Sequence, residues 1–556
     1  MKKIVIASIF IAGLLGLSCG HSNDRYDVLI LNGRIVDGTG DPWYYGDVGI
    51  RGDKIVAIGK LASASATRRI DASGKIVSPG FIDMLGQSGM SILVDNRAMS
   101  KISQGVTTEV TGEGGSVAPV NDRIRTEMAP YLEKYKLTVN WDDFEGYWRR
   151  FSSNKSAINL ASFVGATQVR AYVVGYDERD PSPQELDQMK ELVRDAMKQG
   201  ALGVSSSLIY APATYAKTQE LIELAKAAAE YGGMYISHIR DEGDEGKEAE
   251  AIYEAADIAR AAHCSVEIWH LKVAGYENWG KMPDVVRQIE SLRREGIDMT
   301  ADLYPYIASS NSLDATVPGW AHAGGRAKLL ERLADKETRE KIRAELTGSH
   351  AGLGVNFEGI LIAQTFNPQL KEFEGKRLNE VAKAWNEDPY DALFDFILKD
   401  SSRTGKITFS MSEQDLRFAM GQNWVSFCSD ANARATDGPL SEGKPHPRAY
   451  GAFVRAIGKY ARDEKILTLE EAVRKMTSQP ATRVGLKERG ILKPGFYADV
   501  VVFDPETIAD KATFEQPHQY AAGVENVFVN GQEVWEGGKW TGNLPGKPLM
   551  GPGYGR

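Results

Sequence analysis

The sequence predicts an α/β protein, a (β/α)₈ TIM-like barrel with a small β-domain built from both chain ends. Three observations support this fold class. Eight short apolar runs alternate with helix-like segments through the middle of the chain, which is typical of parallel βα units. Strand-rich stretches with frequent turn residues flank this region on both sides. The 556 residues are enough for a barrel, an insertion and a second unit.

The first residues have the pattern of an export signal. Two lysines precede an apolar run from Ile4 to Leu17, which is short for a membrane span, and Cys19 follows directly after a small residue. This resembles the lipidation site of bacterial lipoproteins, although Gly16 stands where such signals usually place leucine. We expect residues 1–24 to direct export, giving a protein that is periplasmic or lipid-anchored to the envelope through Cys19. A plain secreted protein is the alternative.

Both ends of the chain predict short hairpins. From Asp27 to Gly59, β-branched runs are separated by turn glycines and aspartates, and the same pattern returns from Phe496 to Val534. We therefore expect residues 25–78 and 490–545 to form one small β-domain beside a barrel at 79–489.

Eight candidate strands run through the central region, and eight strands close a (β/α)₈ barrel. The strands are expected at 81–84, 107–111, 160–164, 202–207, 234–238, 266–270, 298–303 and 424–429. Between the fifth and sixth strands, Ile252, Ala255 and Ala259 recur at helical spacing. The gap before the eighth strand is too long for one crossover, so we expect a lid-like insertion over the barrel mouth at about 313–346.

The composition is that of an ordinary soluble globular protein, with 42% hydrophobic and 25% charged residues. A net charge of -9 gives no electrostatic reason to expect nucleic acid or an anionic membrane surface as a partner. We expect small molecules or peptides as partners, and membrane contact only through Cys19.

Polar residues at the carboxyl ends of the strands are the candidates for chemistry, because barrel enzymes place their active sites there. His238 and His270 end the fifth and sixth strands, Glu113 follows the second, and Asp430 follows the eighth. Two imidazoles and two carboxylates are well suited to zinc. Matching positions of the histidines on adjacent strands favour a metal site. Glu113 could instead be a loop carboxylate, and Asp430 could be the N-cap of the next helix.

Several motifs together resemble a known family. They are residues 77–83, 206–212, 302–306 and 446–451, with His238, His270 and Asp430. In combination they resemble the N-acyl-D-amino-acid deacylase (D-aminoacylase) branch of the amidohydrolase superfamily, from about Tyr26 to Lys539. This resemblance implies a barrel with a small β-sandwich made from both chain ends, bound zinc, and hydrolysis of an amide.

The chain departs from that family at two places. Superfamily members usually follow Phe-Ile-Asp with His-x-His on the first strand, whereas residues 84–87 here are Met-Leu-Gly-Gln. D-aminoacylases also resemble one another in a cysteine ligand after the second strand, where this chain offers Glu113. Because a carboxylate can replace a thiolate on zinc, we expect one zinc per chain, held by Glu113, His238 and His270.

A mechanism follows from the residues and the resemblance. Asp430 is expected to take a proton from the attacking water and pass it to the leaving amine. The expected substrate is an N-acyl-D-amino acid or a dipeptide-like amide that contains a D-amino acid, and its α-carboxylate needs cations and hydroxyl donors. The candidates for these contacts are Lys272, Arg240, Arg448, Tyr210 and Tyr304.

Two other functions stay open at this point. A cyclic-amide hydrolase resembling dihydroorotases or hydantoinases would usually bridge two metals with a modified lysine near the end of the fourth strand, where this chain has serines at 205–207. A barrel that lost catalysis with the first-strand histidines would be a binding protein of the cell envelope. Metal content and amidase activity distinguish these functions.

Overall fold

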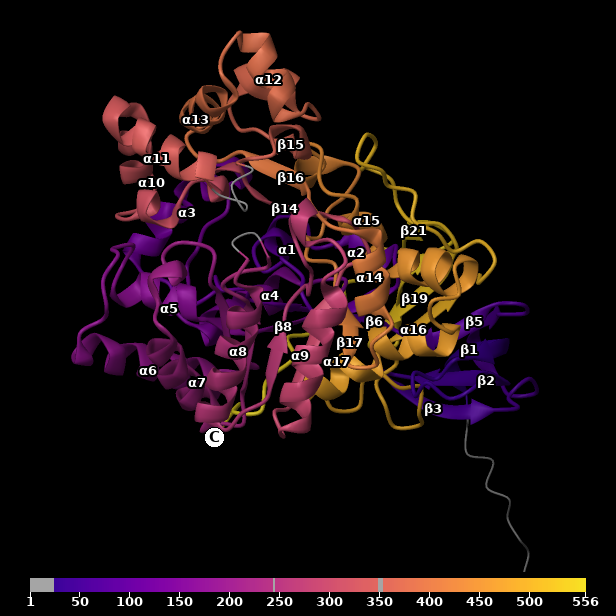
Figure 1. Cartoon of the computed structure of the whole chain (residues 1–556). Coiled ribbons are helices and arrows are strands. Elements are labelled where there is room, and N and C mark those ends of the chain that lie inside the picture. The colour runs from indigo at the N-terminus through magenta and orange to yellow at the C-terminus, as the bar shows by residue number, and fades with distance from the viewer. Residues whose placement is uncertain (1–24, 244–245, 349–353) are drawn as a thin grey trace, which may run out of the picture.

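The computed structural model describes residues 25–243, 246–348 and 354–556 (Figure 1). The expected export signal, with Cys19, lies outside the described residues. No helix in the described part of the chain is long and apolar enough to cross a membrane.

A closed ring of parallel strands forms the centre of the molecule. The strands are β6 (Phe81–Asp83), β7 (Val106–Thr111), β8 (Asn159–Ser162), β9 (Val164–Gly165), β10 (Gly203–Ser207), β11 (Met234–His238), β12 (Val266–Ile268), β13 (Met299–Leu303) and β17 (Val425–Phe427). They pair as β6-β7-β8 and as β9-β10-β11-β12-β13-β17. Only Phe163 separates β8 from β9, so these two make one barrel strand. A parallel bridge between Gly86 and Ala431 joins the ends of β6 and β17. The predicted eight-stranded barrel is confirmed.

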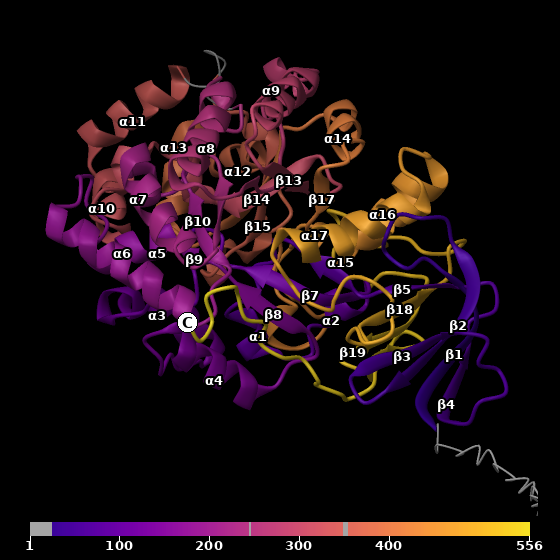
Figure 2. The ribbon, with the colours of Figure 1, turned by 90° about the horizontal axis from the view of Figure 1, so that it is seen from below.

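Helices surround the barrel and connect its strands (Figure 2). They are α1 (Ser91–Val94), α2 (Met99–Ile102), α3 (Asp122–Tyr135), α4 (Phe144–Asn154), α5 (Ala166–Val173), α6 (Pro183–Lys198), α7 (Thr218–Ala229), α8 (Glu248–Ala262), α9 (Met282–Arg294), α14 (Glu413–Met420), α15 (Arg448–Arg455), α16 (Leu469–Met476) and α17 (Ser478–Arg483). The helix α8 buries Ile252, Ala255 and Ala259 as its apolar spacing predicts. A capping box of Ser182 and Glu185 fixes the start of α6.

Both chain ends build the small β-domain. Its strands are β1 (Tyr26–Ile35), β2 (Tyr44–Arg51), β3 (Lys54–Gly59), β4 (Ala66–Asp71), β5 (Ile76–Pro79), β18 (Val500–Phe503), β19 (Val524–Val529), β20 (Gln532–Glu536) and β21 (Lys539–Trp540). All nine belong to one hydrogen-bonded sheet. The N- and C-terminal parts meet where β5 pairs antiparallel with β18, with Val77 opposite Val502. Figure 2 shows the indigo and yellow strands lying side by side. Ile30, Val48 and Phe528 are buried in the core between them.

An insertion with its own core lies between β13 and β17, at the top of Figure 1. Its elements are β14 (Ala308–Ser312), α10 (Arg326–Ala334), α11 (Lys336–Gly348), β15 (Ile360–Gln364), α12 (Leu378–Trp385), α13 (Pro389–Lys399) and β16 (Gly405–Phe409). The strands form an antiparallel sheet in the order β14-β16-β15. The insertion therefore runs from Ala308 to Phe409 and is longer than the expected 313–346. Strand β14 reads Ala-Ser-Ser-Asn-Ser and lacks the apolar alternation by which a strand is predicted.

A buried cluster of charged groups ties the first, second and last barrel strands together. Lys101 Nζ lies 2.7 Å from Asp83 Oδ2 and 3.0 Å from Glu109 Oε2, and all three side chains are completely buried. The same ammonium group donates to Ser429 Oγ and to the carbonyl oxygen of Ala431, each at 2.8 Å. One cation thus holds two carboxylates and the segment that follows β17.

Replacing Lys101 should destabilise the protein strongly. We expect Lys101→Met to lower the free energy of unfolding by about 3–5 kcal/mol, because Asp83 and Glu109 would remain buried without a cation. Urea denaturation followed by circular dichroism measures the change. The matched control is Lys198→Met on α6, because Lys198 is exposed and pairs with Asp195 one turn away, so no measurable loss is expected. Equal unfolding midpoints for the two variants would contradict the role of Lys101.

Candidate metal centre

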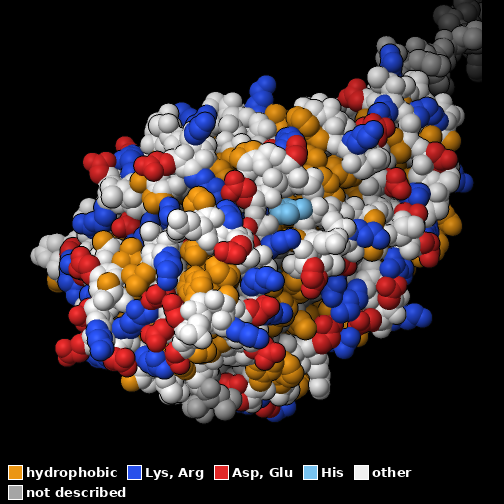
Figure 3. Space-filling model, turned by 90° about the horizontal axis from the view of Figure 1, so that it is seen from above, with side chains coloured by type: hydrophobic (Ala, Val, Ile, Leu, Met, Phe, Trp, Pro, Cys, Tyr) orange, Lys and Arg blue, Asp and Glu red, His pale blue; other side chains and the backbone are white. Residues whose placement is uncertain are grey.

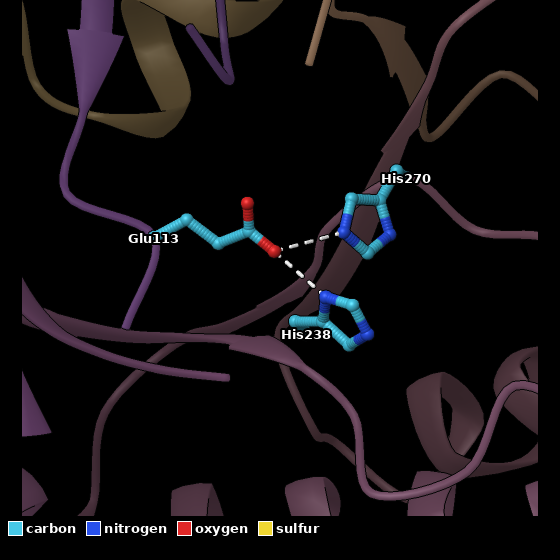
Figure 4. Close-up of side chains that lie close together, drawn as sticks. All are labelled: Glu113, His238 and His270. Atoms are coloured by element: carbon cyan, nitrogen blue, oxygen red, sulfur yellow. Dashed lines mark hydrogen bonds and ion pairs between the residues drawn. The ribbon is translucent and has the colours of Figure 1, made fainter. Parts of the chain in front are cut away.

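Three side chains from three barrel strands meet at the mouth of the barrel. Glu113 follows β7, His238 ends β11, and His270 comes two residues after β12. Glu113 Oε1 lies 2.7 Å from His238 Nδ1 and 3.1 Å from His270 Nε2 (Figure 4). One donor atom of each side chain lies within 4.8 Å of the other two. The structure thus brings together the three residues that were predicted to be ligands.

The backbone of His270 is held in an unusual conformation. Its φ is 38°, in the left-handed region that costs a residue other than glycine about 1–3 kcal/mol. Asp302 on β13 stabilises this turn. Its carboxylate accepts a hydrogen bond from the N–H of His270 at 2.6 Å, and its carbonyl oxygen accepts one from Leu271 at 2.8 Å. Asp302 therefore orients the imidazole, a role that the sequence did not reveal.

The three side chains fit a divalent metal ion. Two imidazoles and one carboxylate are the donor set of catalytic zinc sites that keep one coordination position open. Burial raises the pKa of Glu113, but the hydrogen bonds from His238 and His270 outweigh this effect and lower the pKa well below its usual value. Glu113 is therefore a carboxylate, as an anionic ligand must be.

A further carboxylate, Glu242, lies behind the two histidines. Its Oε1 is 3.0 Å from His270 Nδ1, its Oε2 is 3.6 Å from His238 Nε2, and Lys272 Nζ is 2.5 Å from Oε1. Burial and Lys272 lower the pKa of His270, yet Glu242 and Glu113 raise it to about 10. Carboxylates in this position orient the imidazoles that bind a metal. Glu242 was missed in the sequence, where its only signal is its place four residues after His238.

Asp430 approaches the same site from the end of β17, the last strand of the ring. Its φ of 45° is also left-handed, and its N–H donates to the carbonyl oxygen of Leu85 at 2.7 Å. Burial raises the pKa of Asp430, against the opposing effect of the Arg448 guanidinium. Arg448 Nη1 lies 2.9 Å from Asp430 Oδ2. The side chain, 12% exposed, is thus a largely buried carboxyl group beside the metal ligands and is not the N-cap of a helix.

Gln87 connects the two carboxylates. Its Nε2 donates to Glu113 Oε2 and, at 3.2 Å, to Asp430 Oδ1. In the sequence this residue was noted only because the first strand lacks histidine, so its position between the ligands and Asp430 is a finding of the structure.

A cavity of about 1380 Å³ opens over these side chains, lined by barrel and insertion residues together. Of the predicted substrate contacts, the structure places four along the cavity and leaves Arg240 out. The four are Lys272, Tyr210, Tyr304 and Arg448. Arg240 instead pairs with Glu254 at 2.9 Å and donates to the carbonyl oxygens of Thr214 and Ala216. The prediction for Arg240 was therefore wrong, because its side chain points to the surrounding helices. Seen from above, positive and negative side chains are interspersed over this face of the molecule (Figure 3).

Comparison with known proteins agrees with this geometry. Residues 431–535 match the model of the amidohydrolase family. A D-aminoacylase of Alcaligenes xylosoxydans xylosoxydans is 34% identical over 94% of this chain and 97% of its own length. The chain belongs to the D-aminoacylase family of amidohydrolases.

Solved structures of this family are similar over nearly the whole chain. N-acyl-D-glutamate deacylase from Bordetella bronchiseptica, in complex with zinc and a phosphonate inhibitor, is 32% identical with a TM-score of 0.81 and covers 95% of this chain and 100% of its own. A D-aminoacylase structure is 35% identical with a TM-score of 0.79 and covers 94% of this chain and 100% of its own. That structure concerns a binuclear metal centre, with activation by one metal and attenuation by a second. A D-hydantoinase from Thermus, 16% identical with a TM-score of 0.55 over 95% and 100% of the two chains, shares the fold alone.

Metal binding should depend on the two histidines. We expect the purified protein to hold about one zinc per chain and His238→Ala to hold almost none, because a two-ligand site binds zinc too weakly to survive dialysis. Elemental analysis of the dialysed proteins measures this. The control is His263→Asn, at the end of α8, where asparagine tolerates the left-handed backbone (φ 53°). Retention of zinc by His238→Ala would contradict the ligand assignment.

Proposed function

We propose that the chain is a zinc-dependent deacylase that hydrolyses the amide of N-acyl-D-amino acids or of related amides containing a D-amino acid. The observation that carries this proposal is the position of Asp430, which Gln87 connects to the ligand Glu113. A carboxylate beside a three-ligand metal site is the arrangement that amide hydrolysis needs. The relatives named D-aminoacylase and N-acyl-D-glutamate deacylase support the reaction class.

Each residue of the site has a separate role in this reaction. Glu113, His238 and His270 would hold the metal, which when bound supplies a Lewis acid that acidifies water and polarises the scissile carbonyl. Asp430 accepts a proton from the attacking water and delivers it to the nitrogen of the leaving amine. Burial raises the pKa of Asp430, with Arg448 opposing, and this brings the carboxyl group closer to the pKa that a proton shuttle needs at neutral pH.

Arg448 and Lys272 are the proposed contacts for the substrate carboxylate. Arg448 is buried and packs 4.3 Å above the ring of Tyr304, its Nη1 pairs with Asp430, and its Nε has no hydrogen-bond partner in the described part of the chain. A guanidinium with an unsatisfied N–H group beside a cavity is well suited to a carboxylate. Lys272 is paired with Glu242. We propose that it keeps this pair and also contacts the carboxylate of the substrate.

The size of the cavity supports substrates larger than a single acylated residue. Its volume of about 1380 Å³ exceeds the roughly 300–1,000 Å³ of ordinary small-molecule pockets. Insertion residues such as Asn311 and Arg377 line it together with the barrel residues. We therefore include dipeptide-like amides among the proposed substrates.

A substrate panel tests the proposal. We expect turnover of N-acyl-D-amino acids or D-containing dipeptides, and at least about 100-fold slower turnover of the L forms. Asp430→Asn should lower kcat by about 10²–10⁴-fold because it removes the proton shuttle. Zinc content should stay unchanged in this variant, since Asp430 is not a proposed ligand.

The matched control is Asp437→Asn. Asp437 pairs with Arg97 at the surface, so this variant should keep full activity. Equal turnover of D and L forms would contradict the stereochemical part of the proposal, and an active Asp430→Asn enzyme would contradict the mechanism.

We also propose that the protein is exported and held at the envelope by a lipid on Cys19. The support is the sequence pattern of the first residues alone. Expressed with its own N-terminus in a bacterium, the wild-type protein should be recovered with the membrane fraction, whereas Cys19→Ser should be recovered in the soluble fraction of the periplasm or medium. A wild-type protein found in the soluble fraction would contradict the anchor.

A further inference from the structure

We infer that the Gln87 carboxamide takes the place of a second metal ion, so that the site holds a single metal while Asp430 is positioned by a neutral hydrogen-bond donor. The role of Asp430 in this inference rests on the proposed function. The number of metal ions is inferred from geometry and charge alone.

The position of Gln87 carries the inference. Its NH₂ group has two hydrogens, and its Nε2 donates both to Glu113 Oε2 and to Asp430 Oδ1. A cation that bridged a ligand carboxylate and a second carboxylate would occupy this same place between them. The carboxamide satisfies both oxygens without bringing a charge.

The backbone around Gln87 holds the side chain in place. The N–H of Gly86 donates to Val110 at 2.8 Å and that of Gln87 donates to Ala431 at 3.1 Å. Ser88 donates through its N–H and its hydroxyl to the buried Glu109, at 2.7 and 2.8 Å. A Cβ at Gly86 would lie 2.0 Å from Glu109 Cδ, so only glycine allows this close approach. Gln87 is therefore held by both neighbouring strands.

Among the described residues, the rest of the first strand offers no free ligand for a metal of this kind, because its carboxylate, Asp83, is paired with Lys101. Met84 and Leu85 are fully buried in the apolar core. A thioether is a soft ligand that favours copper(I) over zinc, and a leucine side chain has no donor atom. The carboxylates next to Gln87 are Glu113 and Asp430, and their facing oxygens already accept hydrogen bonds from Gln87.

Charge also limits the site to one divalent ion. Glu113, Asp430 and Glu242 bring three carboxylates, and Lys272 and Arg448 bring two fixed cations, all within the lining of one cavity. One divalent ion already makes the formal charge of this group positive. A second would add two more positive charges to this group.

Metal content of the wild-type protein is the first test. Dialysed against excess zinc and then against buffer, the protein should retain about one zinc per chain, and its activity should stay constant as zinc is raised well above one equivalent. Retention of about two zinc ions, or a loss of activity on binding the second, would overturn the inference. A protein that retains no zinc would instead contradict the proposed function, so the two failures can be distinguished.

Two substitutions test the carboxamide itself. Gln87→Leu removes both donors at similar volume, and we expect it to keep about one zinc with an unchanged KM while kcat falls by about 10–100-fold. Gln87→Glu places a further carboxylate where the donors were, and we expect it to retain a second equivalent of zinc.

Gln516→Glu, at an exposed position, controls for the added charge and should match the wild type. Circular dichroism spectra and unfolding midpoints check that each variant is folded. A Gln87→Leu enzyme with wild-type kcat would overturn the positioning role. A Gln87→Glu protein that still retains about one zinc would overturn the view that the amide donors exclude the second ion.

Discussion

A single buried ammonium group holds the catalytic end of this barrel together. Lys101 pairs with both Asp83 and Glu109, which are fully excluded from water. Asp83 in turn accepts hydrogen bonds from the N–H and hydroxyl of Ser429, and Glu109 accepts two from Ser88. Ser429 precedes Asp430 and Ser88 follows Gln87, so the residues at the site take their positions from a charge cluster one layer below. Without this cation, two buried carboxyl groups would lie close together with no countercharge.

Oppositely charged side chains are also paired within the site itself. Glu242 contacts the two histidines and Lys272, and Arg448 pairs with Asp430. Such pairing fixes each side chain before substrate binds, which is how electrostatic preorganisation lowers a reaction barrier. The left-handed backbones of His270 and Asp430 are consistent with this view, because such strain persists only where neighbouring contacts enforce it.

The fold and most of the site could be predicted from the sequence. Apolar runs bounded by turns revealed the barrel strands, and Glu113, His238, His270 and Asp430 could be predicted because each stands at a strand end. Glu242, Asp302 and Gln87 could not, since their roles arise from contacts between segments far apart in the chain. Arg240 was misplaced for a related reason. The alternation of side chains fixes direction only within a strand, and Arg240 lies two residues beyond the end of β11.

The loss of histidine from the first strand is compatible with an active site because that strand contributes no proposed ligand here. The ligands come from the second, fifth and sixth strands and the proton shuttle from the eighth, while the first strand lies between the second and the eighth. The requirement on the first strand is to connect the two carboxylates that follow the second and the eighth strands. A carboxamide on a backbone held by Val110 and Ala431 meets that requirement without any charge. The number of metal ions in such a barrel then depends on Gln87, a residue that does not itself bind a metal ion.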